Sequence, residues 1–121
     1  MNKFILIVED YPETLSMLLT FLESEGYTVK AAESGEEALR LVSEQKFDII
    51  LLDIMLPRVD GFEVSRRIKS DPKTKDIPII AITAFDVRNI KDKCYEAGIN
   101  EIFLKPLDLP GLLEIIKKYV P

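Results

Sequence analysis

Five polar residues stand at the ends of apolar runs, where folding could bring them into one reactive pocket. They are three acids, one hydroxyl and one amine: Glu9, Asp10, Asp53, Thr83 and Lys105. Three carboxylates placed close together repel one another unless a divalent cation neutralises them. Aspartate can accept a phosphoryl group when a metal and a fixed cation screen the incoming charge. These residue types therefore indicate Mg²⁺-assisted phosphoryl transfer, with Lys105 and Thr83 contacting the phosphoryl oxygens.

Any one of these residues could simply be a polar residue where a strand meets the surface. The set as a whole is better explained by a shared site, because the acids, the hydroxyl and the amine each close a different apolar run. Asp53 is the clearest case. It ends the run Ile49–Leu52, which is apolar without alternation, as expected for a strand covered on both faces. Pro57 and then Asp60-Gly61 mark the loop that follows.

The elements that must position these residues alternate between strands and helices. The apolar runs predict strands over Lys3–Glu9, Thr28–Ala32, Ile49–Asp53, Ile79–Thr83 and Glu101–Lys105. Helical patterns predict helices over Pro12–Glu25, from Ser34 to about Gln45, from Asp60 to about Ser70, from Asp86 to Gly98, and over Leu109–Tyr119. Ser34 with Glu37 and Asp60 with Glu63 read as capping boxes, and Asp86 as an N-cap.

Five strand–helix units in strict alternation predict an α/β fold, with a parallel sheet covered by helices on both faces. The units are too few for a barrel, so an open, doubly wound sheet fits better. Among such sheets we choose the order 2-1-3-4-5, although strand order is not visible in a sequence. This order brings the five polar residues to one crevice at the carboxyl ends of the strands.

Composition narrows the function classes. The chain has 121 residues, enough for one domain over residues 1–121, and a net charge of −5, which argues against a nucleic-acid or anionic-membrane surface. It has no histidine, which excludes Ser-His and Cys-His nucleophilic sites and His-bound zinc. The lone Cys94 fits a reducing compartment. Glu9-Asp10 interrupts the run Phe4–Val8, so this run is neither a signal peptide nor a membrane span.

Four short motifs carry a resemblance to a known family. They are Glu9-Asp10; Asp53 followed by Met55-Leu56-Pro57 and Asp60-Gly61; Thr83-Ala84; and Lys105-Pro106. In this order and spacing the whole chain resembles the receiver domain of two-component response regulators, in particular the single-domain, chemotaxis-regulator-like members. The resemblance implies a flavodoxin-like fold and supports the chosen strand order.

The resemblance also implies roles for the residues. Asp53 would accept the phosphoryl group from a phosphohistidine on a sensor histidine kinase or histidine phosphotransfer protein. Mg²⁺ would be held by Glu9, Asp10, Asp53 and the backbone carbonyl of Met55. Thr83 and Lys105 would bind phosphoryl oxygens, helped by backbone amides near Met55 and Ala84, and Lys105-Pro106 would be a cis peptide.

As a whole, the resemblance implies a cytoplasmic signalling module in a phosphorelay rather than an enzyme. It would switch protein–protein contacts with a downstream target through its fourth helix, fifth strand and fifth helix. The chain stops at Pro121, just past the last predicted helix. We therefore expect either action by protein contact alone or a piece of a longer regulator.

Three residues depart from the family pattern. Members usually carry an aromatic switch residue three positions before the lysine, where this chain has Ile102. Ile102 is either an ordinary strand residue or a sign that signalling proceeds through backbone and fourth-helix shifts. Met55 and Phe85 stand two positions after Asp53 and Thr83, where family members flank the route of hydrolytic water. Two apolar side chains do not orient a water, so we expect slow autodephosphorylation and a long-lived aspartyl phosphate.

Two helices carry more apolar residues than one buried stripe needs. In the first predicted helix these are Leu15, Met17, Leu18, Leu19, Phe21 and Leu22. The helix is either deeply packed or offers an apolar margin on which a kinase helix docks. In the last helix they are Leu112, Leu113, Ile115 and Ile116. With Ile102 and Tyr95 they form a candidate surface for output or for phosphorylation-dependent homodimerisation.

Other functions fit less well. A phosphatase or transferase resembling the haloacid dehalogenase family needs a second Asp two residues after the nucleophile, where this chain has Met55. A constitutive scaffold that has lost phosphorylation would not need the intact set of Asp10, Asp53, Thr83 and Lys105. A nucleotide-binding role lacks a glycine-rich phosphate loop after the first strand.

Overall fold

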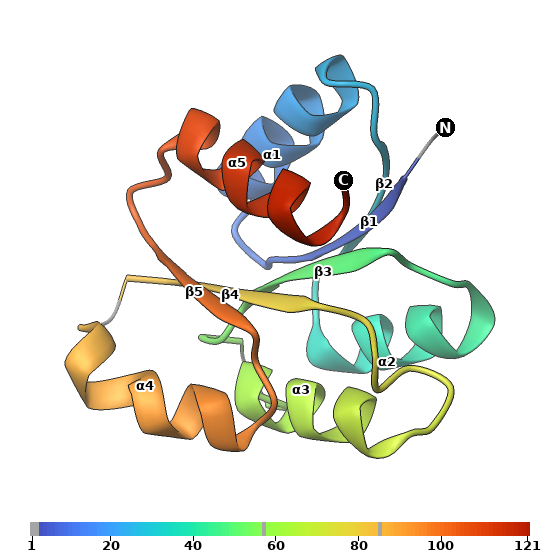
Figure 1. The fold of residues 1–121 in the computed structure, drawn as a ribbon, viewed down its shortest axis with the longest axis vertical. Helices are drawn as coiled ribbons and strands as arrows, with labels where there is room; N and C mark the ends of the chain where they lie inside the picture. The colour runs from blue at the N-terminus through green and yellow to red at the C-terminus, as the bar shows by residue number, and fades with distance from the viewer. Residues whose placement is uncertain (1–2, 57, 85) are drawn as a thin grey trace.

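A computed structural model describes residues 3–56, 58–84 and 86–121. Within these residues five strands and five helices alternate along the chain (Figure 1). The strands are β1 (Phe4–Val8), β2 (Thr28–Ala32), β3 (Ile49–Asp53), β4 (Ile79–Thr83) and β5 (Glu101–Leu104). The helices are α1 (Pro12–Ser24), α2 (Gly35–Glu44), α3 (Gly61–Ser70), α4 (Val87–Glu96) and α5 (Leu109–Tyr119). The predicted alternation is confirmed, and each boundary falls close to its expected position.

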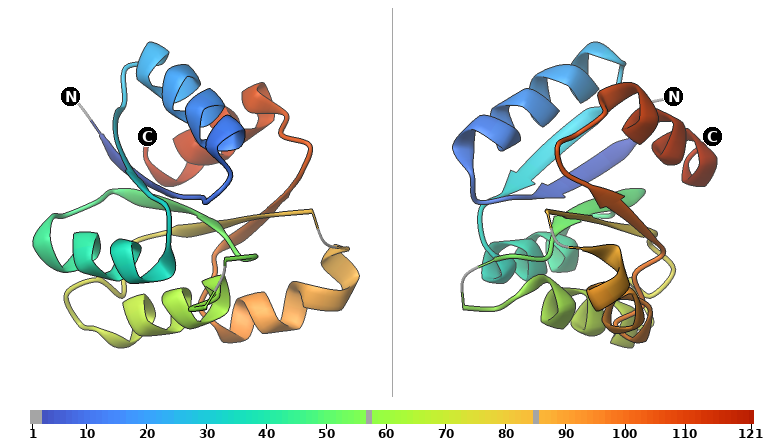
Figure 2. Two further views of the ribbon diagram at one scale, coloured as in Figure 1. Left: turned by 180° about the vertical axis from the view of Figure 1, so that it is seen from behind. Right: turned by 90° about the vertical axis from the view of Figure 1, so that its left-hand side faces the viewer.

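The strands form one parallel sheet in the order β2-β1-β3-β4-β5, as expected. The sheet lies between two layers of helices. α1 and α5 cover one face, and α2, α3 and α4 cover the other (Figures 1 and 2). The carboxyl ends of the strands therefore gather at one edge of the sheet, at the left in Figure 1.

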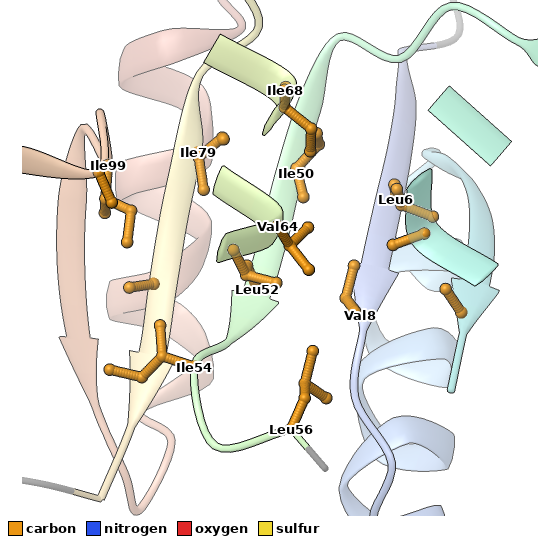
Figure 3. Close-up of a cluster of buried hydrophobic side chains, with 14 of the residues drawn as sticks. Leu6, Val8, Ile50, Leu52, Ile54, Leu56, Val64, Ile68, Ile79 and Ile99 are labelled. Carbon is orange, nitrogen blue, oxygen red and sulfur yellow. The ribbon is translucent and has the colours of Figure 1, made fainter. Parts of the chain in front are cut away.

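The central strand β3 is buried along its whole length, as its unbroken apolar run predicts. Ile50 and Leu52 point into the core beneath α2, α3 and α4, where Figure 3 shows them beside Val64 and Ile68 of α3. Ile49 and Leu51, which alternate with them along the strand, point into the opposite core, beneath α1 and α5. Each such side chain contributes about 1.5–3 kcal/mol on burial, so the strand that ends in Asp53 is firmly held on both faces.

Side-chain N-caps begin the middle helices. The Ser34 hydroxyl accepts the Glu37 N–H at 3.1 Å, and the Asp86 carboxylate accepts the Arg88 N–H at 2.9 Å. Both N-caps were predicted from the sequence. The reciprocal half of the first capping box is wrong, however, because the Glu37 carboxylate accepts the N–H of Glu33 at 2.8 Å, one residue before the cap.

The cap of α3 follows the same rule with a different departure. The Asp60 carboxylate accepts the Glu63 N–H at 2.9 Å, as predicted. The Glu63 side chain does not return to the cap but pairs with Arg66 at 3.1 Å and Arg67 at 2.9 Å. Two guanidinium groups one turn away attract a carboxylate more strongly than a neutral backbone N–H does.

Most of the apolar surplus of α1 is used in packing. Leu18 and Leu22 are fully buried, and Leu15, Leu19 and Phe21 lie partly buried against the same core. Only Met17 of the predicted set remains exposed, at 41%. The deeply packed interpretation therefore accounts for five of the six residues.

The last helix is similar. Leu112 and Ile116 are fully buried, and Ile115 packs partly buried against the core. Leu113 and Ile102 are half-buried, while Tyr95 is exposed. The candidate output surface is thus less apolar than the sequence suggests, with Tyr95 as its main exposed aromatic residue.

Two sequence expectations remain. Pro57, expected to stop the third strand, lies outside the described residues. The peptide bond between Lys105 and Pro106 is cis, as the family resemblance implies.

Among the described residues, no helix has the length and apolar character needed to cross a membrane.

Candidate functional site

Asp53 is the last residue of the buried strand β3 and is only 5% exposed. Its Oδ1 atom accepts the backbone N–H of Met55 at 2.9 Å. The first residue of α3 packs against the backbone next to Asp53, because a Cβ atom added to Gly61 would approach the Cα of Ile54 to 2.4 Å. Strand burial, the Met55 amide and the close approach of Gly61 together fix where the Asp53 carboxylate lies.

Glu9 and Asp10 follow β1, the strand next to β3. Glu9 is almost completely buried, whereas Asp10 is exposed. The backbone N–H of Tyr11 donates to the Glu9 carboxylate at 3.2 Å. Carboxylate oxygens of Glu9, Asp10 and Asp53 lie within 4.8 Å of one another. The structure therefore brings the three predicted acids together, and their hard oxygen donors suit a single divalent cation such as Mg²⁺.

Lys105 follows β5 and reaches across β4 to both buried acids. Its ammonium lies 3.1 Å from Glu9 Oε1 and 3.3 Å from Asp53 Oδ2. Its backbone N–H donates to the carbonyl oxygen of Thr83 at 2.7 Å. The sequence predicted Lys105 as a partner for phosphoryl oxygens, but the bridge to Glu9 was not foreseen.

Thr83 ends β4, the strand between those of Asp53 and Lys105. Its side chain is fully buried. All five predicted residues therefore lie at the same edge of the sheet, and four of them are buried or half-buried. Phe85, the second of the two apolar residues expected near the hydrolytic water, lies outside the described residues.

The charges in this pocket are not balanced. Burial first, and then the neighbouring Asp53, raises the pKa of Glu9 above its ordinary value. Burial lowers the pKa of Lys105, but the hydrogen bond to Glu9 and the charge of Asp53 outweigh it, so the pKa of this ammonium is raised. The pocket thus holds its lysine charged and still carries a surplus of negative charge, which favours a bound cation.

Three exposed residues with apolar or aromatic side chains stand next to pocket residues in the chain. Tyr11 and Met55 are each 55% exposed, and Leu104 is 45% exposed. Met55 was singled out from the sequence by its spacing from Asp53. Tyr11 was missed, although its position directly after Glu9-Asp10 was the available signal. We call Tyr11 and Met55, which stand nearest to these acids in the chain, the apolar rim of the pocket.

Comparisons with known proteins agree with this geometry. Residues 5–117 match the family model for the response regulator receiver domain. The chain is 37% identical over 120 residues to the polar-differentiation response regulator DivK of Brucella ovis, which covers 99% of this chain and 98% of the relative.

Two solved structures are similar over nearly their whole length. One is the receiver domain of sensor histidine kinase PA1611 from Pseudomonas aeruginosa PAO1, with a magnesium ion in its active-site cleft. It has a TM-score of 0.92 and 32% identity, and the match covers 99% of this chain and 98% of that one. The other is the response regulator TrrA of Thermotoga maritima in complex with Mg²⁺-BeF. It has a TM-score of 0.87 and 34% identity, and the match covers 97% and 98%.

Proposed function

The chain belongs to the family of response regulator receiver domains, and on that premise we propose that it is a phosphorylation-switched signalling module with Asp53 as its phosphoacceptor. The proposal takes the domain to span residues 1–121 and to act in the cytoplasm. One observation carries it: the Lys105 ammonium lies 3.1 Å from Glu9 and 3.3 Å from Asp53, beside three carboxylates close enough to share one cation.

Glu9, Asp10 and Asp53 are the residues that would hold Mg²⁺, together with the backbone carbonyl of Met55. The ion fits here because three carboxylates with one lysine leave a negative surplus, and because Mg²⁺ prefers oxygen ligands. When bound, it supplies positive charge next to the phosphoryl oxygens. The magnesium ion in the Pseudomonas receiver supports this assignment.

In the transfer step an Asp53 carboxylate oxygen attacks the phosphorus of a donor phosphohistidine. A P–O bond forms while the P–N bond breaks, and the electron pair stays on the imidazole nitrogen of the donor. The Lys105 ammonium offsets charge on the phosphoryl oxygens, the Thr83 hydroxyl donates a hydrogen bond to one of them, and the Met55 amide holds the attacking carboxylate of Asp53. Buried and already hydrogen-bonded, Asp53 needs little reorganisation before it reacts.

The partners follow from this chemistry. The donor is a sensor histidine kinase or a histidine phosphotransfer protein, which we place over the apolar rim of Tyr11 and Met55 and the exposed Met17 of α1. The output is a change in contact with a downstream protein, or with a second copy of the chain, through α4, β5 and α5. Because Ile102 replaces the usual aromatic residue, the signal would travel through the backbone and α4 rather than through a rotating ring.

Autodephosphorylation should be slow. Met55 stands beside Asp53 with an apolar side chain that cannot position a water for attack on the acyl phosphate. The chain would then act as a switch with a long-lived phosphorylated state rather than as a phosphatase.

The decisive experiment is phosphorylation of the intact protein by acetyl phosphate with Mg²⁺, followed by mass spectrometry. We expect one phosphoryl adduct in the wild type and in Asp92→Asn, an exposed acid on α4. We expect none in Asp53→Asn. Equal labelling of Asp53→Asn and the wild type would refute the assignment.

A second measurement tests the metal. Mg²⁺ should raise the melting temperature of the wild type, because binding to the folded state alone stabilises it. Asp10→Asn should weaken this response, whereas Asp92→Asn should not. A response to Mg²⁺ that is the same in all three proteins would place the ion elsewhere.

A further inference from the structure

A network of hydrogen bonds joins α3, α4 and α5 at the edge of the sheet opposite the pocket. Its centre is Asn100, in the turn between α4 and β5. Asn100 Oδ1 accepts the backbone N–H of Ile79 at 2.9 Å and the ammonium of Lys69 at 3.1 Å. The same ammonium donates to the carbonyl of Ile77 at 2.7 Å. One side-chain oxygen thus connects α3 and the start of β4 to the turn that follows α4.

The next residue extends the network to α5. The Glu101 carboxylate accepts the Tyr119 hydroxyl and lies 3.3 Å from the Lys118 ammonium. The backbone of Asn100 is also held, since its N–H donates to the carbonyl of Ile79 at 2.9 Å. The last turn of α5 is therefore tied to the beginning of β5.

Two further contacts fasten α4 to α3. The buried Ser65 hydroxyl donates to the carbonyl of Ala97 at 2.7 Å. Gly98 has φ +85°, and an added Cβ atom would approach the Lys69 side chain to 2.6 Å. Only glycine allows the turn to lie this close to the lysine stem. We call Ser65, Lys69, Asn100, Glu101 and Tyr119 the distal hub.

The other end of α4 is held differently. From residue 86 to residue 96, the side-chain hydrogen bonds and ion pairs among the described residues join only Asp86 to Arg88, within the first turn. Ile90 and Cys94 pack into the core from this helix. Residue 86 is only three positions beyond Thr83, which ends β4 at the pocket. In Figure 1, α4 runs away from this edge, so its first turn lies near the pocket and its last turn at the distal hub.

We propose that the distal hub is the fixed pivot of the output surface and that Asn100 is its central positioning residue. When the Thr83 hydroxyl moves to bind a phosphoryl oxygen, it pulls on the first turn of α4. Because the turn that follows α4 is fixed, the helix tilts instead of shifting as a whole. The output surface then changes most at its pocket end. This inference rests on the proposed function, and it adds the element that converts a local displacement into a rotation.

The chain offers a matched pair of variants. Asn100→Asp keeps an oxygen that accepts from both Ile79 and Lys69, whereas Asn100→Ala removes it. Lys69→Met is a second test, because it keeps an unbranched stem beside Gly98 but lacks the ammonium. Hydrogen exchange of the backbone amides, measured on the full chain, reports on both ends of α4.

Without any ligand, Asn100→Ala should accelerate exchange at Ile79 and at residues 97–101 by about tenfold, the effect of losing a typical hydrogen bond. Residues 86–92 should exchange as in the wild type. Lys69→Met should give a smaller acceleration at the same sites, and Asn100→Asp none. If Asn100→Ala leaves residues 97–101 unchanged, or if it and Asn100→Asp behave alike, the hub is not an anchor.

With Mg²⁺ and beryllofluoride, a phosphoryl mimic, the wild type should change its exchange at residues 86–92 and not at 97–101. In Asn100→Ala the change should spread into 97–101. Equal changes at both ends of α4 in the wild type would overturn the pivot. If beryllofluoride leaves the exchange around Asp53 unaltered in the wild type, the proposed function fails, and the ligand-free comparison still decides whether the hub is an anchor.

Discussion

The two edges of the sheet use charged groups in opposite ways. At the carboxyl edge, Glu9, Asp10 and Asp53 share a single lysine, Lys105. Burial and then Asp53 raise the pKa of Glu9, so folding makes the charged form of this acid less favourable. The pocket is therefore arranged for a cation that the chain itself does not supply.

At the opposite edge the charged groups have hydrogen-bond partners within the chain. The hydrogen bond from Tyr119 is the main reason that the pKa of Glu101 is lowered, so folding favours the charged form of this acid. The Lys69 ammonium has two oxygen partners, but both are neutral, and burial lowers the pKa of this group. The comparison indicates that the acids at the carboxyl edge leave negative charge for a bound cation to neutralise. The charged groups at the opposite edge instead join α3 and α5 to the ends of β4 and β5.

The largest expected effect separates activity from stability. Asp53→Asn should abolish labelling by acetyl phosphate, yet leave the free energy of unfolding unchanged or raise it by up to about 1 kcal/mol, because one of three repelling carboxylates is gone. Asn still accepts the Met55 N–H. Asn100→Ala should do the reverse, lowering stability by about 1–3 kcal/mol while labelling continues. Mass spectrometry and urea unfolding measure the two quantities, and a greater loss of stability in Asp53→Asn than in Asn100→Ala would break the comparison.

The next effect concerns the lifetime of the aspartyl phosphate. Met55→Asn combined with Phe85→Glu should speed the loss of the phosphoryl group by roughly ten- to a hundredfold, because polar side chains can position the attacking water. Asn100→Ala should dephosphorylate at the wild-type rate. A time course of the intact mass after removal of the phosphodonor measures both. Rapid loss in the wild type, unchanged by the double substitution, would rule out the apolar barrier.

One glycine at each edge gives a sharper contrast. Gly61→Ala would place a Cβ atom 2.4 Å from the backbone of Ile54, next to Asp53, and should lower the free energy of unfolding by about 1–3 kcal/mol and slow labelling. Gly98→Ala would place a Cβ atom 2.6 Å from Cγ of Lys69 at a left-handed φ, so it should lower stability by about 1–2 kcal/mol and leave labelling intact. Normal labelling of Gly61→Ala would show that the pocket tolerates movement of α3.

The smallest effect is a dependence on alkaline pH at the distal hub. The hydrogen bond to Glu101 raises the pKa of Tyr119 to about 12, from 10.0. The folded state then holds this proton more tightly than the unfolded state. The resulting stabilisation is complete below pH 10 and is lost as the pH rises through about 12.

Tyr119→Phe should therefore reduce stability at neutral pH and flatten its decline above pH 10. Tyr11→Phe is the control, because Tyr11 is an exposed tyrosine at the opposite edge of the sheet, away from Tyr119. Urea unfolding between neutral pH and pH 12 measures the difference. If the free energy of unfolding of the wild type and of Tyr119→Phe changes with alkaline pH in the same way, the Tyr119 hydroxyl does not stabilise the hub.

What the sequence revealed depended on how local each signal is. The burial of β3 and the place of Asp53 followed from one short apolar run, and the N-caps of Ser34, Asp60 and Asp86 followed from residues within a single turn. The side chains of Glu37 and Glu63 were predicted wrongly. Their choice depends on which of several nearby donors competes best, and a capping pattern does not encode that competition.

Interactions between distant segments were the hardest to predict. The five pocket residues could be grouped because each one ends or closely follows a strand, and a parallel sheet aligns the carboxyl ends of its strands. The distal hub has no such rule. Lys69, Asn100 and Tyr119 belong to a helix, a turn and another helix, and their meeting depends on side-chain lengths and packing angles that only the folded chain defines.

The bridge from Lys105 to Glu9 spans 96 positions in the chain. During synthesis the three acids leave the ribosome well before the lysine that offsets their charge, and contacts between such remote segments form late in folding. An unfinished polypeptide therefore carries the three acids without the cation that offsets their charge. The pocket takes its final arrangement only when β5 docks and brings Lys105 to Glu9 and Asp53.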